Sequence, residues 1–118
     1  MVSPAVGKVI LVPFPFSDLS RSKLRPAVVV GDAGRGDWVL CQVTSNPYGD
    51  PAAISITDES FTRGSLRITS FARPGKLFTA TSGLMLNEVG MLKGNVARQI
   101  IAAIIMMLQK GLEHEKTG

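Results

Sequence analysis

The sequence predicts a β-rich α+β fold, in which short strands build one small domain and a single helix ends the chain. Short apolar runs rich in Val, Leu and aromatic residues recur through most of the chain, each bounded by Gly, Pro, Ser or Asp, as is typical of buried strands. Near residue 95 this pattern gives way to apolar residues at helical spacing. With 118 residues, the chain is expected to form one domain, residues 1–118, that folds without metals or cross-links.

The clearest strand predictions are three apolar runs at residues 9–12, 27–30 and 38–43. Residues 31–37 carry three glycines and two aspartates, so they predict a turn that joins the second and third strands in a hairpin. Strands this short suggest a small, strongly bent sheet or barrel. Weaker strand candidates are residues 52–57, where isoleucines alternate, and residues 66–72, 76–79 and 88–92.

Two prolines follow the first predicted strand, in the segment PFPF at residues 13–16. Proline has no N–H to donate to a strand ladder, so this segment is expected to leave the sheet. The polar residues 17–24 would then form an exposed loop.

The terminal helix is predicted over residues 95–110, with Asn95 as its N-cap and Gly111 just beyond its end. Its apolar residues occupy one stripe and continue onto the opposite side, while its polar residues lie at the two ends. A single packed face cannot cover all of them, which predicts a contact with a second subunit and hence a homodimer. The alternative is a helix wholly buried within its own domain.

Charge and cysteine content limit the partners and the compartment. The formal net charge of +4 and the pI of about 9.6 favour an anionic partner, either nucleic acid or an acidic protein. Cys41 is the only cysteine and lies among apolar residues, which indicates a buried small hydrophobe in a reducing cytosol and not a nucleophile. The sequence shows no targeting signal, and its longest apolar run, residues 100–108, is too short to span a bilayer, so a cytoplasmic protein without a membrane partner is expected.

Arg25 is the strongest candidate for a functional residue, because it lies where the basic loop becomes the second strand. Pro26 fixes the backbone that follows it, and the apolar residues 27–30 anchor the strand. Such an arginine presents a preorganised cation beside the loop. The alternative is an ordinary solvated charge at a strand end.

Three segments in order resemble the MazF/PemK family, the toxins of type II toxin–antitoxin systems. They are GKVILVPFPFSDLSRSKLRPAVVV at residues 7–30, CQVTSNP at residues 41–47 and SFARPGKLFT at residues 70–79. The resemblance implies a small SH3-like β-barrel with a C-terminal helix, and an acidic antitoxin as partner. It also implies an mRNA interferase: a sequence-selective endoribonuclease that cleaves single-stranded RNA and inhibits growth. In the family, the 2′-hydroxyl attacks the adjacent phosphorus without metal or cofactor, which leaves a 2′,3′-cyclic phosphate and a 5′-hydroxyl.

The resemblance also implies roles for individual residues. Arg25 matches the catalytic arginine, whose planar fork suits the nonbridging phosphate oxygens and the leaving group. Thr44 matches a threonine at the end of the third strand, and Ser45 is a second hydroxyl beside it; either could instead bond to its own turn. Arg73 matches an arginine that some members pair with an aspartate two residues later, but that position here is Gly75.

The general base is therefore the least certain part of the predicted site. Asp18 in the first loop is the candidate for deprotonating the 2′-hydroxyl, although it could also cap its own loop turn. His114 is excluded because it lies in a charged tail beyond the predicted helix, where an in-line geometry cannot be held. No cluster has metal-ligand spacing, so neither metal nor cofactor is expected. RNA beyond the phosphate would be bound by the cations and aromatic rings of Phe16, Arg21, Lys23, Tyr48 and Lys76, with the aromatics alternatively in the core.

A second function remains open on the same fold: a non-catalytic binding protein, either a decayed toxin or one similar to the gyrase-inhibiting relatives. The glycine at position 75 favours it. Those relatives end in a tryptophan-containing tail, whereas the only tryptophan here is Trp38, which favours the ribonuclease.

Overall fold

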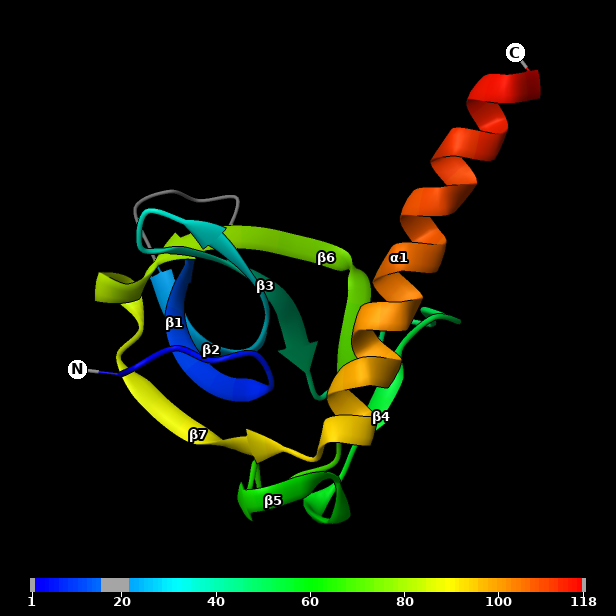
Figure 1. The fold of residues 1–118 in the computed structure, drawn as a ribbon. Helices are drawn as coiled ribbons and strands as arrows, with labels where there is room; N and C mark the ends of the chain where they lie inside the picture. The colour runs from blue at the N-terminus through cyan, green and yellow to red at the C-terminus, as the bar shows by residue number, and fades with distance from the viewer. Residues whose placement is uncertain (1, 16–21, 118) are drawn as a thin grey trace.

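The computed structural model describes residues 2–15 and 22–117, which form a curled antiparallel sheet followed by one helix (Figure 1). This arrangement confirms the predicted β-rich α+β fold with a C-terminal helix. The strands are β1 (Lys8–Pro15), β2 (Ser22–Gly34), β3 (Asp37–Thr44), β4 (Ile54–Ile56), β5 (Phe61–Gly64), β6 (Ser70–Thr81) and β7 (Asn87–Leu92), and the helix is α1 (Gly94–Thr117).

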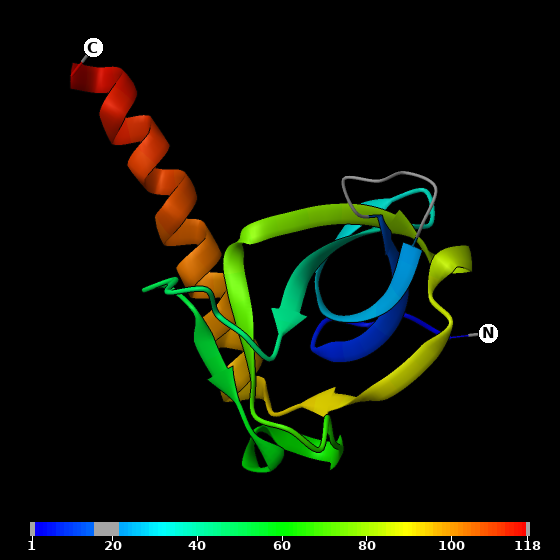
Figure 2. The ribbon, with the colours of Figure 1, turned by 180° about the vertical axis from the view of Figure 1, so that it is seen from behind.

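The seven strands follow the order β4-β6-β3-β2-β1-β7-β5 across the sheet. The two outermost strands, β4 and β5, are joined by the single 3₁₀ turn η1 (Asp58–Ser60), so the chain itself links the two ends of the curl. Figures 1 and 2 show the resulting half-barrel from opposite sides, with α1 against one flank. Strands β2 and β3 pair through the short turn at Gly34 and Asp37, which confirms the predicted hairpin.

Strand β1 runs through both prolines, so the prediction that the PFPF segment leaves the sheet is wrong. Pro13 pairs with Leu24, and Pro15 pairs with Ser22. The carbonyl of Leu11 accepts the N–H of Leu86 at 3.0 Å, on the side of β1 that faces β7. Residues two and four positions later face the same side, beyond the end of β7, so the missing proline N–H groups cost no ladder hydrogen bond.

Strand β6 is longer than predicted, because the candidates at residues 66–72 and 76–79 merge into one strand that starts only at Ser70. The intervening Pro74 and Gly75 lie in a bulge, where the register with β3 shifts between Cys41 and Val43. A bulge accepts proline and glycine because its extra residues do not pair with the neighbouring strand. Strand β5 was missed by the sequence analysis, since its four residues show no run of buried positions.

Alternating residues of the central strands fill two separate cores. Val9, Val28 and Cys41 belong to a core that draws residues from all seven strands and from Ile100 and Ile104 of α1. The next residues along the same strands, such as Ile10, Val29 and Leu40, point to the opposite face and form a second core with Ala80 and Met85. Burial on both faces explains why these strands are continuous apolar runs in the sequence.

Helix α1 extends to Thr117, so its predicted end at Gly111 is wrong. The carbonyl of Lys93 accepts the N–H of Ala97 at 3.1 Å, which makes Lys93 the N-cap in place of Asn95. Gly111 continues the helix, at a cost of about 1 kcal/mol relative to alanine. Glu113 and the charged residues around it are good helix formers, and they support the last turns.

The second half of α1 stands away from the sheet (Figure 1). Ile100 is fully buried, but Ile105, Met106, Leu108 and Leu112 are between 49% and 64% exposed. The alternative of a helix wholly buried in its own domain is therefore wrong. None of the helices in residues 2–15 and 22–117 has the length and hydropathy to cross a membrane.

Candidate active site

Arg25 and Thr44 lie just beyond the same end of the β2–β3 ladder. Ala27 and Gln42 form the last pair of this ladder, and Arg25 and Thr44 are each two residues further along their strands. Ala27 and Leu40 belong to the same core, so alternation places Arg25 and Thr44 on that same face of the sheet. The predicted cation and the predicted hydroxyl therefore share one face at one end of the hairpin.

The side chain of Thr44 is part of the turn that follows β3. Thr44 is 8% exposed, and its Oγ1 accepts a hydrogen bond from the Asn46 N–H at 3.2 Å. The bond to its own turn, which the sequence analysis left open, is therefore present. A hydroxyl that accepts a hydrogen bond still has a proton to donate, so this bond is compatible with a role in holding a phosphate. Ser45 follows as an exposed residue at the start of the turn.

The loop at residues 45–53 is organised by side chains that bond to its own backbone. Asn46 Oδ1 accepts the N–H of Tyr48 at 2.8 Å, and Asp50 Oδ1 accepts the N–H of Ala52 at 2.9 Å. These two Asx turns present Tyr48 at the surface, 68% exposed and with a φ of 54°. A positive φ is rare for an aromatic residue, and it is held here by the two turns.

Arg73 of β6 lies against this loop. Its Nε donates to Asp50 Oδ2 at 3.1 Å, and its Cζ is 5.5 Å from the centroid of the Tyr48 ring. The Arg73 and Asp50 side chains are 18% and 17% exposed, so this ion pair is partly shielded from water. The hydrogen bond from the Ala52 N–H, followed by that from Arg73, holds the pKa of Asp50 below its ordinary value of 3.8.

Arg73 faces the same side of the sheet as Thr44. Ala72 pairs with Val43, and both lie in the core that contains α1. The next residue along β6 points to the opposite face, which is the face of Thr44 and Arg25. Strands β2, β3 and β6 therefore carry two arginines and a threonine on one face of the sheet.

Asp50 is the residue of this cluster that the sequence analysis missed. Its place in NPYGDP indicated a turn, and the bond to Ala52 is such a turn. Its pairing with Arg73 crosses 23 positions of sequence, and only the topology reveals it. At position 75, where some members of the family carry an aspartate, a Cβ would lie 3.7 Å from Met107 Sδ of α1, so a side chain there would face the helix.

The remaining predicted residues are distributed around this cluster or lie outside the described residues. Lys23 is exposed on β2, two positions from Arg25 and hence on the same face, and Lys76 is exposed beside the bulge of β6. Phe16, Asp18 and Arg21 lie outside the described residues. The backbone of His114 belongs to α1, so the predicted tail at this position is instead helical.

Cys41 lies directly behind the site, where its fully buried thiol donates to the carbonyl of Arg73 at 3.1 Å. Burial, opposed in part by this hydrogen bond, raises the pKa of Cys41 from 9.0 to about 12. The thiol is therefore neutral in the folded protein at all ordinary pH values, as the sequence analysis predicted for a buried hydrophobe.

We expect Cys41 to resist alkylation by iodoacetamide at pH 8 in the folded protein and to react fully in urea, because the thiolate is the reactive form. The raised pKa of Cys41 also makes the free energy of unfolding depend on pH. Below pH 9.0 the thiol is protonated in both the folded and the unfolded chain, so it has no effect. Above pH 9.0 the unfolded chain loses this proton before the folded one does, so the free energy of unfolding falls as the pH rises. Alkylation of the native protein at the rate of a free thiol would contradict this account.

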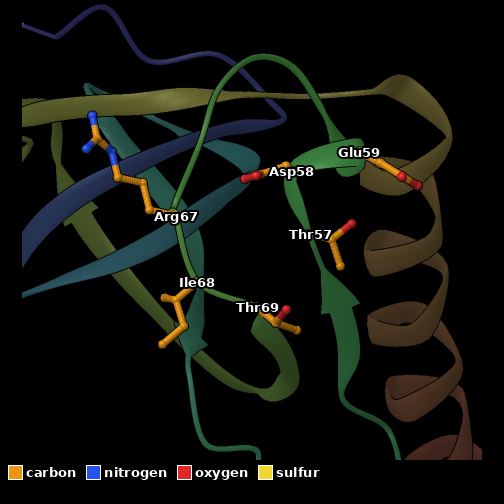
Figure 3. Close-up of a pocket in the computed structure, with 6 residues that line it drawn as sticks. All are labelled: Thr57, Asp58, Glu59, Arg67, Ile68 and Thr69. Carbon is orange, nitrogen blue, oxygen red and sulfur yellow. The ribbon is translucent and has the colours of Figure 1, made fainter.

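A separate pocket lies between η1 and the start of β6. It is lined by Thr57, Asp58, Glu59, Arg67, Ile68 and Thr69 (Figure 3). Asp58 and Glu59 point to opposite sides in this view, and Asp58 accepts a hydrogen bond from Ser65. None of the predicted site residues lines this pocket, and its charged groups do not converge, so we place the candidate site at the surface around Arg25 and Arg73.

Known proteins resemble this chain in fold and not in sequence. The chain matches no known protein-family model and no curated protein sequence. Its structure is similar to MazF in a MazE–MazF complex from Deinococcus radiodurans, with a TM-score of 0.72 and 16% identity over 92% of this chain and 98% of the other. An endoribonuclease from a mycobacterial species has a TM-score of 0.68 and 17% identity over 92% and 94% of the two chains. The Mycobacterium tuberculosis toxin MazF-mt6 has a TM-score of 0.57 and 12% identity over 80% and 91%.

These likenesses extend over 80% to 92% of this chain and over 91% to 98% of the others. They include the curled antiparallel sheet and the single C-terminal helix described above. The chain therefore has the fold of the MazF toxins.

Proposed function

We propose that this protein is a toxin of a type II toxin–antitoxin system, of the MazF/PemK kind, and that it cleaves single-stranded RNA at selected sequences. The observation that supports the proposal is that alternation puts Arg25, Thr44 and Arg73 on one face of the sheet, on a fold shared with MazF toxins. Two guanidinium groups and a hydroxyl on one surface suit a phosphate whose charge increases during the reaction.

In the proposed reaction, the 2′-oxygen forms a bond to phosphorus while the bond from phosphorus to the 5′-oxygen breaks. Arg25 binds the nonbridging oxygens and stabilises the additional negative charge, and it also faces the leaving 5′-oxygen. Thr44, with Ser45 beside it, donates to the phosphate. Asp18 takes the proton of the 2′-hydroxyl, and Arg25 gives a proton to the leaving 5′-oxygen to form the 5′-hydroxyl. The proton held by Asp18 then returns to Arg25 through solvent, which restores both groups.

The direct test is incubation of the purified protein with a mixed-sequence single-stranded RNA in EDTA. We expect discrete fragments, because the proposed chemistry uses only groups of this chain and the 2′-hydroxyl of the substrate. RNA that stays intact at a high excess of protein over substrate would contradict the proposed function.

The proposed partners are a second copy of the chain, single-stranded RNA and an acidic antitoxin. The apolar residues Ile105, Met106, Leu108 and Leu112 on the projecting part of α1 support a homodimer, for which light scattering should give a mass near twice 12.6 kDa. A monomer at micromolar concentration would contradict it. The net charge of +4 and the likeness to MazF solved with MazE support an acidic antitoxin, and the proposed site of action is the cytoplasm.

The second candidate function is RNA or protein binding without cleavage. The pairing of Arg73 with Asp50 favours it, because an arginine neutralised within the protein contributes less charge to a transition state. The same incubation separates the two functions: binding in a gel-shift assay without any fragments would favour the non-catalytic protein.

A further inference from the structure

The guanidinium of Arg73 is held by two side chains of the loop at residues 45–53. Asp50 Oδ2 binds its Nε at 3.1 Å, and the Tyr48 ring lies 5.5 Å from its Cζ. Nε is the inner nitrogen of the guanidinium, so this bond leaves the outer edge, with its two terminal nitrogens, for other partners. Within residues 2–15 and 22–117, the only ion pair of Arg73 is the one with Asp50.

The loop that supplies these two side chains is itself fixed at both ends. Thr44 Oγ1 accepts the N–H of Asn46, and Asn46 Oδ1 accepts that of Tyr48. Asp50 is fixed a second time through Oδ1, which accepts the N–H of Ala52. Hydrogen bonds thus fix the first part of the loop to Thr44, the predicted phosphate-binding hydroxyl, and separately fix the carboxylate that holds Arg73.

We propose that Asp50 is a positioning residue for catalysis, which aims the outer edge of Arg73 at a backbone phosphate of the RNA beside the scissile one, while Tyr48 stacks on the base of that nucleotide. This inference rests on the proposed function, and it assigns a role to the loop that the sequence analysis treated only as a turn. The ligand is one unpaired ribonucleotide, read by an aromatic face and an arginine fork.

The geometry supports both parts of this assignment. An arginine whose Nε is already hydrogen-bonded loses little further conformational entropy when its terminal nitrogens bind a phosphate. Ordering of the side chain therefore lowers the affinity only slightly. Tyr48 is 68% exposed, whereas Phe78, a second aromatic residue that the sequence offers for stacking, packs against the second core. Its ring lies beside the guanidinium, so a stacked base and a bound phosphate would belong to the same nucleotide.

A positioning role for Asp50 and a purely electrostatic role predict different effects of the same substitution. Replacing Asp50 with asparagine removes a negative charge beside the RNA, which by charge alone should strengthen RNA binding. If Asp50 positions Arg73, the same variant should lower kcat about tenfold or more while KM stays the same or falls, because misplacement of a catalytic group affects mainly the transition state.

The experiment compares Asp50→Asn and Tyr48→Ala with Asp32→Asn as the matched control. Asp32 also caps its own turn, through a bond from the Gly34 N–H at 2.8 Å, and it is exposed in the β2–β3 hairpin. Steady-state cleavage and thermal unfolding are measured for each variant. We expect a drop in kcat for Asp50→Asn with a folded protein, an increase in KM for Tyr48→Ala, and no change for Asp32→Asn. Equal kcat values for Asp50→Asn and Asp32→Asn would overturn the proposal.

A second measurement keeps this inference separate from the proposed function. An RNA oligonucleotide with 2′-deoxy substitutions cannot be cleaved by the proposed chemistry, so its binding can be followed by fluorescence anisotropy even if the wild type shows no activity. Tyr48→Ala should weaken its binding about tenfold, since stacking of one base contributes on the order of 1–3 kcal/mol, whereas Asp50→Asn should bind it at least as tightly as the wild type. Unchanged binding for Tyr48→Ala would overturn the role of the loop, whereas intact RNA with wild-type protein would overturn only the ribonuclease.

Discussion

Replacing Arg25 with alanine is expected to lower the rate of RNA cleavage by about a hundredfold or more. Arg25 lies two residues from Ala27, whose pair with Gln42 ends the β2–β3 ladder, and alternation places it on the same face of the sheet as Thr44. Pro26 restricts the backbone of Arg25 to extended conformations, so the cation is placed before substrate arrives. Its loss removes charge stabilisation that the reaction needs only at the transition state, so the effect should appear in kcat.

The matched control for this variant is Arg98→Ala, which removes the same charge from an exposed position of α1. Its cleavage rate should stay within about twofold of the wild type, because long-range charge effects are small at physiological salt. Arg25→Lys separates charge from geometry, since lysine keeps the charge but cannot bind two phosphate oxygens at once. A normal rate for Arg25→Ala would move the catalytic cation to Arg73.

The largest effect on stability is expected for Ile100→Ala, at about 2–5 kcal/mol of the free energy of unfolding. Ile100 is fully buried in the core that contains residues from all seven strands. Truncation would leave a cavity where the helix meets both ends of the curled sheet, and a close-packed core relaxes into such a cavity only in part.

The measurement for this prediction is urea unfolding at pH 7, with Gln99→Ala as the control. Gln99 is the preceding residue of α1 and is exposed, so its replacement should change stability by less than about 0.5 kcal/mol. A loss below about 1 kcal/mol for Ile100→Ala would show that α1 does not contribute to the core in the way described.

The sequence predicted the hairpin that carries part of the candidate site. Glycines in residues 31–37 marked its turn, and the apolar runs on either side marked its two strands. The register shifts twice between the turn and Ala27, so the residue of β3 that lies nearest Arg25 does not follow from the hairpin alone.

The parts that the sequence did not predict depend on contacts between distant segments. Asp50 and Arg73 are 23 residues apart, and no local pattern distinguishes a turn aspartate that also pairs with a residue of a later strand. Pro13 and Pro15 suggested a break in β1 because the sequence does not show that β7 ends before reaching them. Gly111 suggested the end of α1, although a single glycine costs a helix too little to stop it.

The bulge in β6 also depends on contacts with a distant strand. The propensities of Pro74 and Gly75 disfavour a strand ladder, so the sequence predicts a break between two strands at this point. The bulge instead lets β6 continue, turns its carbonyl at Arg73 toward the thiol of Cys41, and presents the Arg73 side chain to the loop. The propensities of Pro74 and Gly75 therefore predict the irregular backbone correctly, but they do not predict that the strand continues through it.

The central claim is that the 2′-hydroxyl of the RNA is the nucleophile in a reaction assisted by Arg25. The most direct measurement is the analysis by mass spectrometry of the fragment ends from one RNA, together with its copy carrying a 2′-deoxy sugar at the cleaved position. We expect 2′,3′-cyclic phosphate and 5′-hydroxyl ends from the RNA, and no cleavage of the deoxy-substituted copy. Fragments with 5′-phosphate ends, or equal cleavage of the copy, would contradict the claim.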